Sequence, residues 1–481
     1  MITFFASIFL LLAGYFIYAR VCEKIFGMDP QRKTPAETRA DRVDYIVMPG
    51  WKIFLIQFLN IAGLGPIFGA VAGAMWGPVA FLWIVLGCIF AGGVHDYFSG
   101  MLSIRHDGQS FSEISGIYLG NGVRQFMRGF SVVLLIMVGT VFIMGPARIL
   151  SDLTNGFGGT FFWTALIFIY YVLSTILPID KLIGRIYPVF GVTLLFMAAG
   201  IMVMMVYNRL PVPELTLGSF ENMHIRPDKF PVFPMLLITI ACGAVSGFHA
   251  TQSPLMARCI RNERQGRGIF FGAMVTEGIV ALIWAAISMS FFGGIRELNA
   301  TMDQHAGNAA WAVNEISRSL LGRIGGVLAI LGVVAAPVTS GDTAFRSARL
   351  IIADFLQLEQ ASLKKRLWIT VPLFAVGFLL TQLDFAIVWR YFAWTNQTLA
   401  MIVLWTITMY LVRERKFYWV ALVPAFVMTV ATVSYILVAP EGFSLPVNAS
   451  YIAGLAAGVA LLVPVVREVN RYGSVYKLAG K

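Results

Sequence analysis

Ionisable side chains inside long apolar segments are the residues of this 481-residue chain that could carry chemistry. A charge at the middle of a bilayer costs about 2.5–3.5 kcal/mol on insertion scales, so each such residue needs a role. Glu277 stands well inside one apolar segment, and His249 follows a glycine-rich run in another. Because its unperturbed pKa is about 6.5, His249 is suited to carry a proton. The alternative is a histidine that is hydrogen-bonded in a helical core.

Oxygen-bearing side chains form a second candidate cation site between positions 337 and 343. Asp342 precedes Thr343 and lies within one helical turn of Thr339 and Ser340. Carboxylate and hydroxyl oxygens suit Na⁺, and the carboxylate alone suits a proton. The alternative is that these residues only end a helix that faces the cytoplasm. The expected ion-coupling residues are Thr339, Ser340, Asp342, Thr343, His249 and Glu277.

Two polar pairs add to these candidates. His95 and Asp96 lie near one end of an apolar segment, where they either join a site or cap a helix among the headgroups. Asn396 and Gln397 lie inside a later segment and are expected to contact substrate. The chain has no nucleotide-binding glycine loop, no His-Glu-x-x-His motif and no credible Ser/His/Asp arrangement. We therefore expect no enzyme, and transport driven by a gradient.

Two glycine-rich runs interrupt apolar segments 180 positions apart. They read Ile61-Ala-Gly-Leu-Gly-Pro-Ile-Phe-Gly-Ala70 and Ala241-Cys-Gly-Ala-Val-Ser-Gly-Phe-His-Ala250. Glycine and proline favour unwinding, and broken backbone at membrane depth lines a cavity or is buried in protein. Paired interruptions point to a transporter's binding site, although glycines that only allow close helix packing are the alternative. The expected substrate-binding residues are Gly63, Gly65, Pro66, Phe68, Gly243, Ser246, Gly247, His249, Asn396 and Gln397.

The composition indicates which elements position these residues. Apolar residues make up 58% of the chain and charged residues only 13%, against about 25% charged in a soluble domain. The apolar runs are long and continuous, unlike the alternating strands of a membrane barrel. We expect an all-α polytopic membrane protein with about 13 transmembrane helices, near 2–20, 52–74, 77–100, 129–150, 160–178, 185–207, 232–254, 268–293, 323–345, 367–383, 387–411, 417–438 and 447–466.

The basic residues orient these helices. If segment 20–52 is cytoplasmic and the spans alternate, 28 of the 36 Lys and Arg residues fall on the cytoplasmic side. This split predicts an external N-terminus and a cytoplasmic C-terminus. The net charge of +11 is then a sign of topology, and no nucleic-acid partner is expected. The four cysteines lack metal-ligand spacing, and a disulfide is not expected.

The order of the spans suggests an inverted repeat. Both glycine-rich runs lie in the first span of a set of five, and an odd number of spans inverts the second set. The expected organisation is a peripheral helix and basic segment (1–48), a first repeat (49–210), an external loop (211–231), a second repeat (232–411), and two peripheral helices with a tail (412–481).

Several motifs, from Met28–Ala36 and Ile61–Pro66 through Ile238–Ala250 to Asn396–Ala400, together resemble the carbon starvation protein A family of bacterial peptide and pyruvate transporters, in its short form. Two departures concern the first glycine-rich run: no histidine occurs in the preceding Pro49–Phe58, and Gly69-Ala70 stands where the family has Gly-Pro. These departures affect substrate identity more than fold. The motifs lie in Met28–Ala36, Ile61–Pro66, Arg105–Ser110, Ile238–Ala250, Asp342–Arg349 and Asn396–Ala400.

The resemblance implies the five-plus-five fold of the amino acid–polyamine–organocation superfamily, the leucine-transporter-like type. We expect a transporter in the bacterial inner membrane that imports peptides, or a small carboxylate such as pyruvate, during carbon starvation. H⁺ or Na⁺ would be the coupling ion, with no cofactor, and the oligomeric state stays open. Amides at Gly65–Phe68 and Gly247–His249 would bind the substrate carboxylate. An ion channel, and a membrane sensor without transport, are the alternatives.

Overall fold

Residues 1–41, 44–154, 156–176, 179–305, 307–358 and 362–472 are described in the computed structural model, and this part contains helices and loops but no strand. The first helices are α1 (Ile2–Ala13), α2 (Ala19–Phe26), α3 (Pro35–Thr38), α4 (Gly50–Ile61), α5 (Ala70–Gly73), α6 (Val79–Leu86), α7 (Gly93–Arg105), α8 (Phe111–Leu119), α9 (Asn121–Leu153), α10 (Gly159–Ile176) and α11 (Ile179–Tyr207). The later helices are α12 (Val232–Thr239), α13 (Ala241–Ala244), α14 (Gly247–Ala257), α15 (Gly272–Phe291), α16 (Ile295–Gln304), α17 (Ala309–Ala329), α18 (Ala335–Leu356), α19 (Leu363–Leu380), α20 (Phe385–Arg413), α21 (Trp419–Val438) and α22 (Val447–Tyr472).

All thirteen apolar segments expected from the sequence are helical for most of their length. Eight uninterrupted runs in the described part are long and apolar enough to cross a membrane, and a bent pair makes a ninth. The four other segments, in α10, α12–α14, α17–α18 and α19, are shorter, interrupted or more polar. The protein is therefore an all-helical polytopic membrane protein with eight to nine candidate spans. The eight runs are Ile2–Phe26, Val79–Arg105, Asn121–Ser151, Tyr187–Tyr207, Glu263–Phe291, Ile387–Arg413, Trp419–Val438 and Val447–Tyr472.

Both glycine-rich runs interrupt their helices, as predicted. Helix α4 ends at Ile61, and helical structure begins again at the π-helical turn η2 (Gly65–Gly69). The helical segments Gly50–Ile61 and Gly65–Trp76 differ in direction by 54°. In the second run, Val245 (φ −158°, ψ 139°) and Ser246 (φ −146°, ψ 124°) are extended between α13 and α14. These φ/ψ values lie outside the helical region, so the helical hydrogen bonds of the backbone are interrupted at the second break.

The two breaks lie against each other near the centre of the bundle. A Cβ atom on Gly65 of η2 would overlap the Cys242 side chain of α13. A Cβ atom on Gly243 would lie 2.6 Å from Ala281 Cβ of α15, and one on Gly63 would lie 2.6 Å from Phe142 of α9. The glycines therefore allow unwinding and close packing at the same time.

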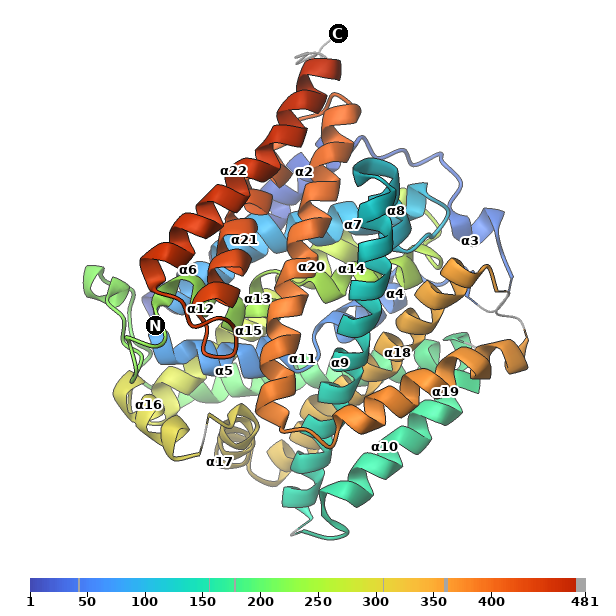
Figure 1. The fold of residues 1–481 in the computed structure, drawn as a ribbon. Coiled ribbons are helices and arrows are strands. Elements are labelled where there is room, and N and C mark those ends of the chain that lie inside the picture. Colours follow the sequence, from blue (N-terminus) through green and yellow to red (C-terminus); the bar gives the residue numbers. More distant parts are fainter. Residues whose placement is uncertain (42–43, 155, 177–178, 306, 359–361, 473–481) are drawn as a thin grey trace.

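Loop segments that the charge pattern places together do contact one another. Arg105 Nε lies 3.1 Å from Glu263 Oε1, and Arg105 Nη2 donates to Gly27 O at 2.6 Å. Lys416 Nζ donates to Phe26 O at 2.5 Å. We call the side formed by residues 20–41, 44–52, 103–110, 258–267 and 413–418 the basic face. In Figure 1 the C-terminal end of α22 lies at the top, far from α16 and α17 at the bottom.

The loops expected on the other side form the opposite face. Asn299 Nδ2 of α16 donates to Met75 O at 2.9 Å, and Ile225 N donates to Asn299 Oδ1 at 3.0 Å. Arg226 and Asp303 form an ion pair at 2.5 Å. Contacts thus separate these loops into two faces, and the grouping agrees with alternating spans.

His224 lies in a partly buried position on the opposite face. Its ring packs against Trp76 (centroids 4.7 Å apart) and Phe230 (4.8 Å), and its Nδ1 accepts a hydrogen bond from Arg226 N at 3.1 Å. Burial, and then the charge of Arg226, lower the pKa of His224 to about 4. The ring is therefore neutral at physiological pH.

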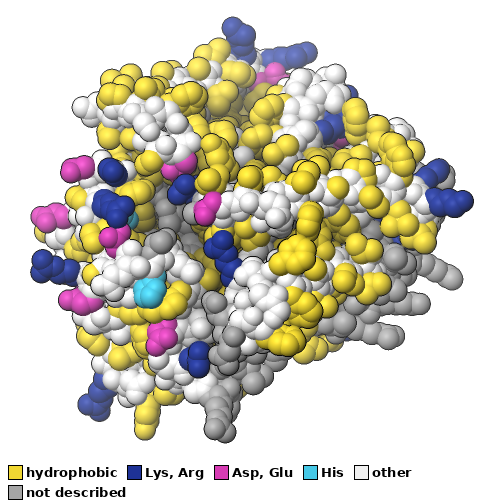
Figure 2. All heavy atoms as spheres, turned by 60° about the horizontal axis from the view of Figure 1, so that its bottom comes forward, with side chains coloured by type: hydrophobic (Ala, Val, Ile, Leu, Met, Phe, Trp, Pro, Cys, Tyr) yellow, Lys and Arg dark blue, Asp and Glu magenta, His cyan; other side chains and the backbone are white. Residues whose placement is uncertain are grey.

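Large apolar side chains cover much of the outer surface. Figure 2 shows hydrophobic side chains spread over one face, with acidic and basic side chains gathered toward one side of the view. Exposed examples are Phe9 (69%), Ile17 (68%), Leu379 (66%) and Ile452 (69%). Exposed apolar surface on this scale is expected where lipid covers the protein.

Candidate functional site

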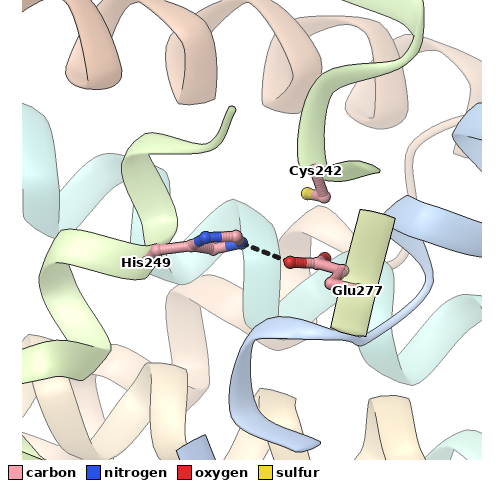
Figure 3. Close-up of side chains that lie close together, drawn as sticks. All are labelled: Cys242, His249 and Glu277. Atoms are coloured by element: carbon pink, nitrogen blue, oxygen red, sulfur yellow. Dashed lines mark ion pairs between the residues drawn. The ribbon is translucent and has the colours of Figure 1, made fainter. Parts of the chain in front are cut away.

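Two histidines and two carboxylates form a buried cluster beside the second break. His249, in the first turn of α14, donates from Nδ1 to Asp96 Oδ2 at 2.8 Å, and His95 Nδ1 donates to Asp96 Oδ1 at 2.7 Å. On its other edge, His249 Nε2 lies 3.4 Å from Glu277 Oε2 of α15. All four residues are 0% exposed. Figure 3 shows the His249 imidazole pointing toward the Glu277 carboxylate. We call these four residues the proton cluster.

Glycine residues bring the elements of the proton cluster together. His95 and Asp96 lie in the first turn of α7, which begins at Gly93, and Gly92 directly precedes this helix. A Cβ atom on Gly92 would overlap the carbonyl oxygen of Ala244, and one on Gly93 would overlap the Phe271 ring. Because no side chain stands between them, α7 can lie close enough to the second break for Asp96 to reach His249.

The hydrogen bonds assign the protonation states that the cluster can adopt. A carboxylate only accepts, so both Nδ1 atoms carry hydrogens and the lone pair of His249 Nε2 points to Glu277. Neither His249 Nε2 nor either carboxylate oxygen of Glu277 has a hydrogen-bond partner among the described residues. One proton placed between Nε2 and Glu277 would satisfy both groups. The pair therefore offers one unfilled proton position inside the bundle.

Cys242 brings a third donor atom near this pair. Its Sγ, His249 Nε2 and a Glu277 oxygen lie within 4.8 Å of one another (Figure 3). Ligand atoms around a tetrahedral Zn²⁺ stand about 3.5 Å apart, given bonds of about 2.0–2.3 Å. The thiol is also engaged with Ser246 Oγ (3.5 Å) and Asn396 Nδ2 (3.7 Å). Because the thiol already bonds to Ser246 and Asn396, only His249 and Glu277 have side-chain atoms without a hydrogen-bond partner at this point among the described residues.

Asn396 and Gln397 of α20 satisfy the backbone at the second break. Asn396 Oδ1 accepts hydrogen bonds from Phe248 N at 2.7 Å and Ser246 Oγ at 3.1 Å. Gln397 Nε2 donates to Val245 O at 2.8 Å. The sequence pointed to these two amides as substrate contacts, and the structure shows them bound to backbone and side-chain groups of the chain.

The amides of Gly65–Phe68 and Gly247–His249 were expected to be free for substrate, and this is wrong for four of them, those of Ile67, Phe68, Phe248 and His249. Phe248 N is bound to Asn396, and His249 N donates to Ser246 O at 3.3 Å. At the first break, the amides of Ile67 and Phe68 both donate to Leu64 O, at 3.2 and 2.7 Å. The chain satisfies these donors because unpaired buried amides are costly. A substrate carboxylate at these positions would have to replace existing bonds.

Gln57 and Asn60 on α4 are polar residues that the sequence reasoning missed. Both are 0% exposed, and neither side-chain amide has a hydrogen-bond partner among the described residues. They are three positions apart, so they share one side of α4 just before the first break. Helix α4 packs against α14 and α15, which carry His249 and Glu277. Two amides in an otherwise apolar span were the available signal.

Asp342 forms a second buried group, apart from the proton cluster. Its Oδ2 accepts hydrogen bonds from Ser174 Oγ at 2.5 Å and Tyr187 Oη at 2.8 Å. The hydroxyls expected beside it donate to backbone carbonyls instead: Thr339 to Ala336, Ser340 to Leu59, and Thr343 to Ser340. Among the described residues, no hydrogen bond or ion pair joins Asp342 to His249 or Glu277.

The remaining predicted site residues lie at the two breaks. Pro66 and Phe68 are buried in η2, and the Phe68 ring packs against Trp389 of α20 with centroids 6.0 Å apart. A Cβ atom on Gly247 would lie 2.6 Å from Leu399 Cβ and closer still to backbone atoms of α20. Helix α20 therefore contacts both breaks.

Two solved transporters share the fold. Mhp1, a nucleobase-cation-symport-1 family transporter in a closed conformation, superposes with a TM-score of 0.55 at 16% identity over 94% of this chain and 98% of its own. MhsT, solved with L-phenylalanine, gives 0.55 at 15% identity over 88% and 99%. The predicted leucine-transporter-like architecture is supported at the level of the overall fold.

Sequence comparisons identify the family. An uncharacterized membrane protein of Haemophilus influenzae is 45% identical over 61% of this chain and 91% of its own. The Bacillus subtilis peptide transporter CstA is 26% identical over 96% of both chains. The Escherichia coli pyruvate/proton symporter BtsT is 26% identical over 58% of this chain and 47% of its own. The family model for carbon starvation protein CstA matches residues 1–161 and 150–323. The chain is therefore a secondary transporter of the CstA family and not an enzyme.

Proposed function

We propose that the protein imports a small carboxylate-bearing solute together with protons, with pyruvate and short peptides as the candidate substrates. The observation that carries this proposal is the proton cluster, in which Asp96, His249 and Glu277 join three helices at 0% exposure beside a broken helix. Distant relatives named as a peptide transporter and a pyruvate/proton symporter support the two substrate classes.

We propose that proton movement is linked to helix movement through the break. His249 lies three residues after Ser246, so a change in its bonding acts directly on the extended segment. Protonation of both His249 and Glu277 would replace their mutual contact with two separate donors, which favours rearrangement of α14 relative to α15. Two conformations with different proton affinity are what a coupled carrier requires.

The membrane arrangement belongs to the same proposal. We place thirteen spans across the membrane, ten of them in two inverted sets of five and three of them peripheral, with the boundaries expected from the sequence. The basic face lies in the cytoplasm of the bacterial cell in this arrangement. The grouping of loops into two faces supports the alternation, and the excess of Lys and Arg supports the orientation.

The experiment is solute uptake by purified protein in liposomes under a pH gradient or a Na⁺ gradient applied separately. Each pH unit supplies about 1.4 kcal/mol per proton, so electroneutral import with one proton gives about tenfold accumulation per unit. Labelled pyruvate and labelled tripeptides serve as probes. Accumulation with a Na⁺ gradient alone would contradict proton coupling and favour a Na⁺ site at Asp342.

Two variants test the role of the cluster. His249→Gln and Glu277→Gln should lose accumulation driven by pH while retaining exchange of substrate for substrate. His305→Gln is the matched control, because this ring stacks on Trp311 (centroids 3.6 Å apart) away from the cluster. Ion flux far above carrier rates would indicate a channel, and binding without uptake would indicate a sensor.

A further inference from the structure

Helix α18 carries a line of charged residues on one side. Asp342, Arg346 and Arg349 are spaced at i, i+4 and i+7, which places them on one helix face. Arg346 Nη2 donates to Ser174 O at 3.1 Å, and Ser174 Oγ donates to Asp342. This face therefore continues from the Asp342 site toward the C-terminal end of α18.

Both arginines are buried, and their guanidinium groups are poorly satisfied. Arg346 is 5% exposed and Arg349 only 2%. Arg346 Nε, Arg349 Nε and Arg349 Nη1 have no hydrogen-bond partner, and neither side chain forms an ion pair with a described residue. An arginine keeps its charge in proteins, and a buried unpaired charge is strongly unfavourable. Such a pair is suited to a negatively charged group that is present for only part of the functional cycle.

Helix α18, which carries the two arginines, contacts α14 between the proton cluster and the basic face. Ser347, next to Arg346, donates to Thr251 O at 3.2 Å and accepts from Gln252 Nε2 at 3.3 Å. These two α14 residues follow His249 by two and three positions, so α18 meets α14 just beyond the proton cluster. Helix α14 then runs on to Ala257, next to the basic-face segment 258–267.

We propose that Arg346 and Arg349 form an anion site, which holds the carboxylate of the transported solute on its way to the basic face. A guanidinium offers a planar pair of N–H donors that matches the two oxygens of a carboxylate. This inference rests on the proposed function. The two arginines would attract the carboxylate out of the central region, where Gln57 and Asn60 provide only uncharged donors.

The test measures substrate affinity separately from each side of the membrane. Arg349→Gln should raise the half-saturating pyruvate or tripeptide concentration at the basic face at least tenfold and leave the value at the opposite face within about twofold. Arg349→Lys, which keeps the charge but loses the planar fork, should give a smaller rise. The control is Arg264→Gln on the exposed basic face. The proposal would be overturned if Arg349→Gln raised the half-saturating concentration equally at both faces, or changed it at neither face.

A binding measurement separates this inference from the proposed function. Pyruvate and acetate should raise the melting temperature of the detergent-solubilised wild-type chain, and Arg346→Gln and Arg349→Lys should reduce that shift. If transport of both probes fails but this protection persists, the function is wrong and the anion site stands. If transport succeeds and neither variant changes protection or sidedness, the anion site is wrong. Where Arg349→Gln does not fold, these two variants carry the test.

Discussion

Replacing Asp96 by Asn should disconnect His249 from its fixed orientation without leaving a cavity. The two carboxylate oxygens of Asp96 each accept one hydrogen bond, from His95 Nδ1 and His249 Nδ1. Asparagine offers one acceptor oxygen and one NH₂ group, so one imidazole would have to turn a lone pair toward the new amide. When that ring is His249, its hydrogen moves to Nε2, and Nε2 can no longer accept a proton from Glu277.

The size of the effect follows from the bond that is lost. A hydrogen bond to a charged group contributes about 1.5–3 kcal/mol. Since about 1.4 kcal/mol is a factor of ten, proton-driven uptake by Asp96→Asn should fall about 10- to 150-fold. The assay is the initial rate of pyruvate or tripeptide uptake into liposomes at external pH values between about 5 and 8. The pH dependence should flatten as the rate falls.

The control is Asp107→Asn, because the ion pair of Asp107 with Arg39 is exposed. Exposed pairs contribute about 0–1 kcal/mol, so this variant should transport nearly as the wild type does. Uptake by Asp96→Asn within twofold of the wild type, with the same pH profile, would refute the role given to the proton cluster.

Three further predictions follow from particular contacts. Gly247→Ala should destabilise the protein by about 1–3 kcal/mol, because the added methyl group would overlap α20. Gly129→Ala, whose methyl group would meet no neighbouring atom, should be neutral or slightly stabilising. Thermal melting in detergent compares the two variants, and equal melting points would contradict the packing argument. An impermeant thiol reagent on intact cells should label Ser319→Cys and spare Arg261→Cys, two exposed positions that the proposed orientation places outside and inside. All four native cysteines are buried, so they should add little background labelling. The reverse pattern would invert the proposed orientation. Because the pKa of His224 is lowered to about 4, the folded state should lose stability as pH falls from about 6.5 to 4. His224→Gln should weaken that loss. If stability falls with pH equally steeply in this variant, the result would argue against a buried neutral ring.

The sequence was sufficient to predict the helices and the places where they break. Membrane helices need about 20 apolar residues, a requirement that can be recognised locally. Glycine and proline at 63–66 and 243–247 act on their own backbone, so the breaks were also predictable. Helices α10 and α19 are not among the eight runs selected by length and composition, although large apolar side chains such as Phe161 and Trp368 are exposed on them.

The candidate site was only partly predictable. His249 and Glu277 were recognisable because each is an ionisable group in an apolar span. Their link through Asp96 was not, because α7 and α14 are separated by more than 140 positions and apolar helices give no amphipathic pattern to show which faces meet. The amides at the breaks were expected to be free because Asn396, 148 positions from Phe248, could not be assigned as their partner from sequence alone.

The contact between Gly65 and Cys242 has a consequence for how this family can vary. A methyl group at position 65 would occupy the space that the Cys242 side chain now fills, so Gly65→Ala becomes tolerable only when position 242 loses its side chain. The two positions should therefore change as a pair among relatives, with total side-chain volume held nearly constant. Since one residue lies in each broken helix, an alteration in either half of the molecule restricts what the other half can accept.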